Sequence, residues 1–282
     1  MKRIPYVLLA TGIFWAACKK NDNPSKQLTN PPPQHEYLTK IDFTTIQDSA
    51  LFLYQQDTVL RAFVEEYSNN GAPVIEALYP VISGGLMTAI NVGADTSGAN
   101  VAVLFSFTFN GNNQVLTSVY HDPVSPYYDS LLYNSSGQLT YVYHFAGVPG
   151  SGAGYTAVDS LTWDANGDVV GLITGDSLHN IASTFSYSAV FTYDNEVNPV
   201  LRTGGSWVVS FDSENYYQYI STHNITGATI NHLDVNDLTS IMEYQTYTYT
   251  YDTAGNPLTL VYTDSENGVT ATENEAFYYV LK

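Results

Sequence analysis

The chain has 282 residues and carries 27 acidic against 9 basic side chains, which gives a formal net charge of −18. Two of the acidic residues precede residue 37, so 25 lie in the body of the chain, where the basic residues are Lys40, Arg61, Arg202 and Lys282. A body this acidic repels nucleic acid and anionic lipid head groups, so the charge argues against both as partners.

The first residues, MKRIPYVLLATGIFWAAC, have the parts of an export signal, with Lys2 and Arg3 ahead of the apolar stretch Ile4–Trp15. That stretch is shorter than the ~20 apolar residues of a membrane-spanning helix and matches a signal-peptide core. An ordinary cleavage site takes a small residue three positions before the cut, where Trp15 is too large. Trp15-Ala16-Ala17-Cys18 resembles instead the lipobox of bacterial lipoproteins, whose usual first residue is Leu.

Cys18 is the only cysteine of the chain, so no disulfide can hold the fold together. We therefore predict that residues 1–17 are a lipoprotein signal peptide and that Cys18 carries the lipid. The lipid would hold the protein on the outer membrane, facing either the periplasm or the cell surface. The alternative is an incidental cysteine in a leader that is discarded.

Residues 18–36 are expected to be the lipidated Cys and a flexible tether, because residues 19–34 contain four prolines and Leu28 as the only large apolar side chain. Such a segment reaches roughly 20–25 Å. Residues 37–282 then form a single domain.

That domain is built from a repeated hairpin motif. In the last clear copy, Tyr247, Tyr249 and Tyr251 alternate with threonines, and the turn residues 252–257 (DTAGNP) lead into 258–262 (LTLVY). Alternation with period 2 is typical of a strand, and Asp, Gly, Asn and Pro are turn residues. The segment is therefore predicted to be a β-hairpin.

In seven copies, the last aromatic of the first strand and the first apolar residue of the second lie six or seven positions apart. The pairs are Tyr54 and Leu60, Tyr79 and Leu86, Phe109 and Leu116, Tyr133 and Leu139, Trp163 and Val169, Tyr193 and Val200, and Tyr251 and Leu258. Successive aromatics are 25, 30, 24, 30, 30 and 58 residues apart. The period near 28 predicts an antiparallel meander of about eight hairpins, and the last gap predicts a divergent copy between Trp207 and Ile241.

The second strands are apolar at alternate positions, for example Leu139, Tyr141 and Tyr143, with Val142 on the opposite face. One of the two faces must therefore be buried, and the other is expected to be partly covered or rich in exposed apolar patches. Most strands are predicted to have about five to seven residues, fewer than the ~9–11 of a strand that spans a membrane. This argues against a transmembrane barrel.

The two ends of the domain look like halves of one unit. Leu38–Phe43 resembles a second strand without its first, and Glu275–Leu281 a first strand without its second. Their pairing would close the sheet into a barrel, and a strongly curved open sheet is the alternative. Ser49–Tyr67 also fits a helix, but the repeat spacing through it favours a hairpin.

Three segments of the repeats resemble segments of a known group of proteins. FTYDNEVNPV (191–200), STHNIT (221–226) and YTYDTAGNPLTLVY (249–262) are similar to segments of uncharacterised Bacteroidota lipoproteins, which carry a domain of unknown function with a porin-like fold. The resemblance implies a many-stranded, barrel-like meander and carries no catalytic residue across. A looser resemblance is to the YD repeats of Rhs-type toxin shells.

No motif for chemistry stands out. Asp164–Asp168 lacks the full calcium-loop pattern and sits at a turn, and His121, His144, His179, His223 and His232 lack zinc-ligand spacing. No nucleophile elbow is present, and Glu65 and Glu66 point to opposite faces of a strand. Trp163, Trp207 and the tyrosines are interpreted as core and cross-strand pairs, with platforms for stacking sugars as the alternative.

The sequence therefore indicates no catalytic residue, cofactor or metal site. It favours an envelope lipoprotein with an all-β domain that binds a glycan or protein ligand without catalysis. A glycan-acting enzyme and a purely structural surface or adaptor protein are the alternatives.

Overall fold

The computed structural model describes residues 36–44, 48–55, 59–69, 72–94, 97–99, 101–152, 154–176, 185–202, 216–234, 239–266 and 269–281. The predicted signal peptide, Cys18 and nearly all of the tether lie outside these residues, so they remain predictions.

The described residues form an all-β fold with two short helices. The helices are α1 (Pro199–Arg202) and α3 (Tyr217–Ile220). The strands are β1 (Glu36–Phe43), β2 (Asp48–Gln55), β3 (Val59–Asn69), β4 (Ala72–Ser83), β5 (Leu86–Gly93), β6 (Ala102–Phe109), β7 (Val115–Tyr120), β8 (Tyr127–Tyr133), β9 (Leu139–Ala146), β10 (Ala157–Trp163), β11 (Val169–Asp176), β12 (Phe185–Val197), β13 (His223–Asp234), β14 (Thr239–Tyr251), β15 (Pro257–Glu266) and β16 (Val269–Leu281).

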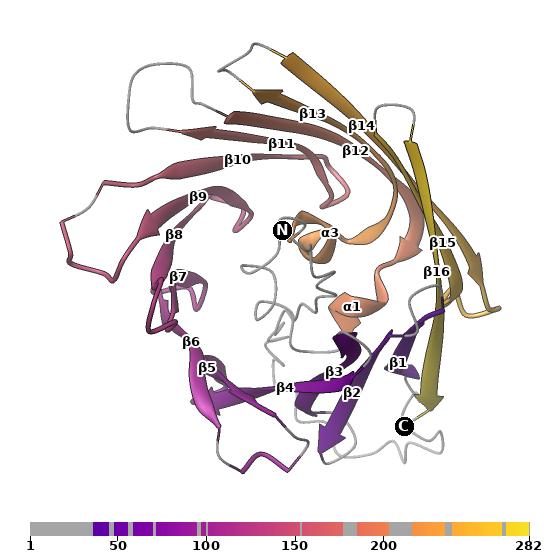
Figure 1. The fold of residues 1–282 in the computed structure, drawn as a ribbon, viewed down its shortest axis with the longest axis horizontal. Helices are drawn as coiled ribbons and strands as arrows, with labels where there is room; N and C mark the ends of the chain where they lie inside the picture. Colours follow the sequence, from indigo (N-terminus) through magenta and orange to yellow (C-terminus); the bar gives the residue numbers. More distant parts are fainter. Residues whose placement is uncertain are drawn as a thin grey trace, which may run out of the picture.

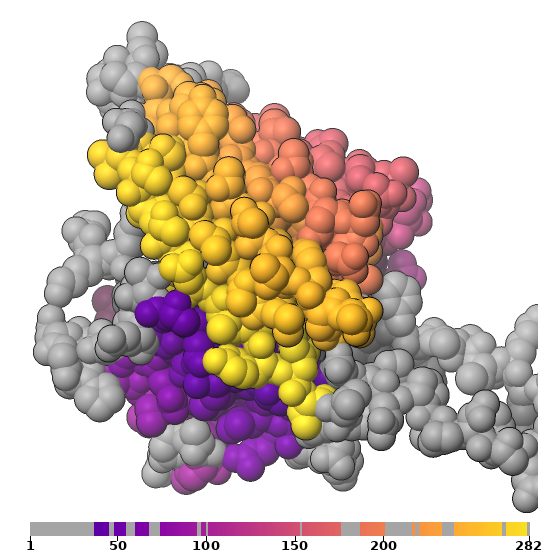
Figure 2. Space-filling model, turned by 90° about the vertical axis from the view of Figure 1, so that its right-hand side faces the viewer, coloured from indigo at the N-terminus to yellow at the C-terminus, as the bar shows by residue number. Residues whose placement is uncertain are grey.

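The sheet is a closed antiparallel barrel in which each strand pairs with its neighbours in sequence and β16 pairs with β1 (Figure 1). The closing register joins Leu38 to Tyr279 and Phe43 to Glu275. In Figure 2 the first strands, in indigo, lie directly beside the last ones, in yellow. The closure predicted from the two half-units is confirmed, and each of the strands that the structure describes has a neighbouring strand on both sides.

The strands are longer than the sequence suggested. Their lengths run from 6 residues in β7 to 13 in β12, β14 and β16. The argument from strand length against a transmembrane barrel therefore does not apply to the longer strands. Ser49–Tyr67 forms the β2–β3 hairpin, with Phe52 opposite Phe63, as the repeat spacing predicted.

Turns of one type connect several hairpins at the same end of the barrel. In the β8–β9 turn, Oδ1 of Asn134 accepts hydrogen bonds from the main-chain N–H groups of Ser136 and Gln138. Gly137 adopts a φ of 85°, a conformation that glycine reaches without strain. Equivalent side-chain caps are made by Asn110, Asp164 and Asp252.

A β-bulge follows these turns and changes which residues face the core. In the β8–β9 hairpin, Tyr133 pairs with Leu139 but Leu132 pairs with Tyr141, so Thr140 is the extra residue. Leu139 and Val142 are buried, whereas Tyr141 is 42% exposed. The prediction that Leu139, Tyr141 and Tyr143 share one face is therefore wrong, because it assumed unbroken alternation. Similar register shifts follow the turns of the β2–β3, β4–β5, β6–β7, β10–β11 and β14–β15 hairpins.

The sixth hairpin contains an insertion that enters the barrel. β12 pairs with β13, and the intervening residues include α1 and α3, which lie within the ring of strands (Figure 1). Val200 is buried in α1 and does not start a second strand, so the predicted pair of Tyr193 and Val200 is wrong. The 58-residue gap is explained by this insertion, with β13 as the second strand, so no extra divergent copy is needed.

The inner face of the wall and the insertion form one packed core. Tyr217 is fully buried and stacks on Phe191 of β12, with the ring centroids 4.0 Å apart. Leu38, Phe63, Ile90 and many other inward residues belong to the same cluster. Within the described ranges, no helix is long and apolar enough to cross a membrane.

Candidate functional site

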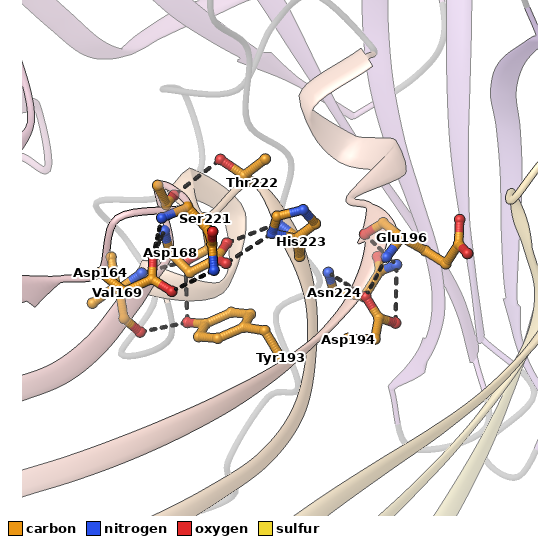
Figure 3. Close-up of polar contacts among 12 residues, drawn as sticks. Asp164, Asp168, Val169, Tyr193, Asp194, Glu196, Ser221, Thr222, His223 and Asn224 are labelled. Carbon is orange, nitrogen blue, oxygen red and sulfur yellow. Dashed lines mark hydrogen bonds and ion pairs between the residues drawn. The ribbon is translucent and has the colours of Figure 1, made fainter.

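A polar network at one end of the barrel fixes where the insertion rejoins the wall (Figure 3). Oδ2 of Asp168 lies 2.8 Å from Nδ1 of His223, and its Oδ1 accepts the main-chain N–H of the same residue at 2.9 Å. The hydroxyl of Ser221 accepts the main-chain N–H of Val169 and donates to the carbonyl of Tyr217. This network joins the β10–β11 turn to the start of β13, so its role is to hold the insertion in place.

The carboxyl groups of Asp164 and Asp194, beside this network, are also engaged by contacts within the fold. Asp164 accepts the N–H groups of Asn166 and Asp168, which lowers the pKa of its carboxyl. Asp194 contacts the hydroxyl of Tyr251 and the side chain of Asn224. Within the described part of the chain, no group of three or more His, Cys, Asp or Glu residues is placed to hold a metal ion.

A second cluster lies on the inner face of β8–β11, where His144 sits between two buried aspartates. Its Nδ1 is 2.8 Å from Oδ1 of Asp129, and its Nε2 is 3.2 Å from Oδ2 of Asp159. Asp159 also accepts hydrogen bonds from the hydroxyls of Thr174 at 2.6 Å and Tyr216 at 2.9 Å. Tyr216 belongs to the insertion, so this cluster ties four strands, β8 to β11, and the insertion together.

The charge on His144 is set by these aspartates. Burial opposes protonation of the ring, but the hydrogen bonds and negative charges of Asp129 and Asp159 outweigh it and raise the pKa of His144 to about 10. Burial also raises the pKa of Asp129, against the effect of His144. At neutral pH the ring is therefore an imidazolium with both nitrogens engaged. Such a ring cannot accept a proton, so this geometry supports a structural role and not general base catalysis.

The same strands carry a cluster of aromatic side chains on the outside of the barrel. We call it the aromatic patch, and it consists of Tyr128 of β8, Tyr141, Tyr143 and Phe145 of β9, and Tyr155 of the β9–β10 loop. The rings of Tyr128 and Phe145 stack with centroids 4.5 Å apart, and Tyr155 packs edge-on against Tyr143 at 5.2 Å. Tyr141 is 42% exposed, and the other four are partly exposed.

The patch faces outward because successive side chains of a strand point to opposite faces of the sheet. Tyr143 and Phe145 flank His144, which points inward, and the bulge at Thr140 fixes this choice of face. The register places Ser130 and Ser160 outward beside the patch, opposite Tyr143 and Tyr141. Among the described residues of β8, β9 and β10, none of the outward positions carries a charge. They are Tyr128, Ser130, Leu132, Tyr141, Tyr143, Phe145, Val158, Ser160 and Thr162.

The candidate residues named from the sequence lie in separate places in the part of the chain that the structure describes. Cys18, His179 and Trp207 lie outside the described residues. Glu65 and Glu66 pair with Ala50 and Ser49 and so point to opposite faces, as predicted. Trp163 packs against the core, which confirms the core interpretation for that residue. Of the histidines that the structure describes, His121 follows β7, His144 lies in β9, and His223 and His232 lie in β13, where His232 contacts Glu243 at 3.1 Å.

Sequence reasoning missed both the aromatic patch and the inner His144 cluster. The patch was hidden because the bulge at Thr140 places Tyr141 and Tyr143 on the opposite face from Leu139. The cluster had a signal in the spacing, since Asp129, His144, Asp159 and Thr174 are each 15 residues apart, half of the 30-residue spacing of these hairpins. That spacing puts one residue per strand at the same height in a meander.

No protein-family model matches the chain, and no curated protein matches it. Among solved structures, a porin-like protein from Bacteroides uniformis is 14% identical and superposes with a TM-score of 0.52, over 87% of this chain and 98% of that one. A porin-like protein from Bacteroides vulgatus is 13% identical, with a TM-score of 0.41 over 86% and 99% of the two chains. The TcdB2–TccC3 structure is 14% identical, with a TM-score of 0.32, over 80% of this chain and 11% of that one. The first of these likenesses shows that the chain shares the fold of the Bacteroides uniformis protein, which confirms the porin-like fold that the repeats implied.

Proposed function

We propose that this chain is a lipid-anchored protein of the cell envelope, whose barrel binds a partner without catalysis. The sequence W-A-A-C at residues 15–18, the single Cys18 and the proline-rich segment after it support the anchor and the tether. The likeness in fold to a porin-like protein is consistent with a place in the envelope.

The observation that carries the binding role is the aromatic patch on the outside of the wall. Aromatic side chains normally bury their large apolar area, and clusters of them left at a surface mark interaction sites. Here the inner face is occupied by a packed core and by the insertion. The binding face is therefore the outer surface of β8 and β9, and the partner does not pass through the barrel.

A catalytic alternative finds less support in the same region. A glycosidase needs two carboxyl groups that reach one sugar. Asp129 and Asp159 both bind the same imidazole ring, and they lie on the inner face with 1% and 6% of their surface exposed. These carboxylates stabilise the barrel and do not act on a ligand.

The binding role is tested by comparing the reactivity of Tyr141 toward tetranitromethane in intact cells and in the purified protein. Tyr244 is the control, because it is an outward tyrosine of β14 with 53% exposure. We expect Tyr141 to react in the purified protein and to be protected in cells, while Tyr244 reacts in both. Equal reactivity of Tyr141 in cells and in solution would contradict the proposal.

The anchor is tested separately with Cys18→Ala. This variant should accumulate as a precursor that takes up no labelled fatty acid. In a phase partition with detergent it should be found in the aqueous phase. A variant that is processed and membrane-bound like the wild type would rule out lipidation at Cys18.

A further inference from the structure

The arrangement of rings in the aromatic patch suggests which kind of ligand it binds. Tyr141 and Tyr143 have centroids 6.1 Å apart, and Tyr155 stands edge-on to both Tyr143 and Phe145, at interplanar angles of 80° and 75°. The rings therefore form one continuous cluster across the β9 surface. A continuous cluster suits a ligand that offers several apolar faces in succession.

The polar groups at the outward positions of β8–β10 that the structure describes are neutral. The tyrosines bring phenolic hydroxyls, and Ser130 and Ser160 bring aliphatic hydroxyls at the outward positions opposite Tyr143 and Tyr141. Each hydroxyl both donates and accepts hydrogen bonds. A sugar ring matches this combination, because it has an apolar C–H face and a rim of neutral hydroxyl groups.

We infer that the aromatic patch is a binding site for neutral glycans, with Tyr141 and Tyr143 as the main stacking residues. This inference rests on the proposed binding function and specifies its ligand class. An anionic polysaccharide is disfavoured by the net charge of −18. A cationic ligand would find no carboxylate among the outward residues of β8–β10 that the structure describes.

The test is affinity electrophoresis of the full-length protein in native gels that contain a neutral β-1,3-glucan, mannan or soluble starch. Gels with polygalacturonate provide the anionic comparison. The variants are Tyr141→Ala, Tyr143→Ala and the double variant, and Tyr244→Ala is the matched control on β14. The melting temperature of each variant establishes that it is folded.

We expect at least one neutral polysaccharide to retard the wild type and Tyr244→Ala, and polygalacturonate to retard neither. Tyr141→Ala and Tyr143→Ala should each weaken the apparent affinity about tenfold, as the loss of one stacking contact implies. Retardation by none of the neutral polysaccharides, or retardation that the patch variants leave unchanged, would overturn the inference. If Tyr141 is nevertheless protected in cells, the binding function stands and only the ligand class is wrong.

Discussion

The indole N–H of Trp163 donates a hydrogen bond of 2.6 Å to the main-chain carbonyl of Leu139, 24 residues earlier. The hydroxyl of Tyr193 makes the same contact with the carbonyl of Val169, also at 2.6 Å and 24 residues apart. In both cases the last aromatic of one hairpin binds the first residue of the second strand of the preceding hairpin. The repeated sequence motif is therefore a repeated contact that links neighbouring hairpins around the barrel.

Trp163→Phe should destabilise the fold by about 1–3 kcal/mol, because the carbonyl of Leu139 loses its partner in a partly buried site. Urea unfolding followed by circular dichroism measures this change. Tyr141→Phe on the outer face is the control and should stay within about 0.5 kcal/mol of the wild type. Equal stabilities of the two variants would show that the contact contributes nothing.

His144→Leu should be more damaging, because it leaves Asp129 and Asp159 buried together without a cation. We expect a loss of about 2 kcal/mol or more at pH 7, with partial recovery in acid as the carboxyl groups become protonated. The free energy of unfolding against pH, obtained from urea titrations, measures both effects. A loss that is as large at pH 4 as at pH 7 would contradict the electrostatic explanation.

The pKa of His144 predicts a second pH effect. The ring holds its proton more tightly in the folded chain, with a pKa of about 10 against an ordinary value of 6.5. Its stabilising contribution is thus complete below pH 6.5 and is lost as the pH rises toward 10. His144→Gln should flatten the fall in the free energy of unfolding over this range, and an unchanged slope would count against the charged form of the ring.

At Glu275, in a different part of the wall, a rise in pH should also reduce stability, but over the range from pH 4.5 to 8. Burial, with the charge of Glu273, raises the pKa of Glu275 to about 8 from 4.5. The folded chain therefore keeps a proton that the unfolded chain releases, so this group makes the fold less stable as the pH rises from 4.5 to 8. Glu275→Gln should raise the melting temperature by several degrees at pH 8 and change it little at pH 4.

Glu66→Gln is the matched control for Glu275→Gln, since it removes the same charge from an exposed position on β3. It should leave the melting temperature nearly unchanged at both pH values. If both variants shift the melting temperature equally at pH 8, the cause is the net charge of the chain and not the site.

Removal of residues 275–282 should open the barrel. The deletion takes away the part of β16 that pairs with β1 and the buried side chain of Phe277. We expect a loss of several kcal/mol and aggregation through the two exposed edges, measured by urea unfolding and light scattering. The double variant Tyr278→Ser/Val280→Ser changes outward side chains of the same segment and should stay soluble. A truncated chain as stable as the full one would refute the closure.

Closure and the hairpins could be predicted because they depend on local signals. The half-units Leu38–Phe43 and Glu275–Leu281 show period-2 patterns without a partner, and Asp, Asn and Gly mark the turns. The face of the sheet on which Tyr141 lies could not be predicted, because the extra residue Thr140 shifts the alternation without changing the local composition. The bulge depends on the pairing of two strands, which a single stretch of sequence does not contain.

The insertion was missed for a similar reason. Residues 193–199 (YDNEVNP) and 251–257 (YDTAGNP) follow the same pattern, yet only the second leads directly into a strand. At Pro199 the chain begins α1, and it later places Tyr216 against Asp159. Contacts between distant segments decide this path, and they appear only in the folded chain.

The central claim is that this barrel is packed inside and offers its binding face outside. Nitration of the purified native protein, mapped by mass spectrometry, tests both parts at once. Tyr141 of the patch should react readily, whereas Tyr216 and Tyr217, which are 4% and 0% exposed, should react only after unfolding in urea. If Tyr216 and Tyr217 react in the native protein as fast as Tyr141, the interior is open to solvent and the account is contradicted.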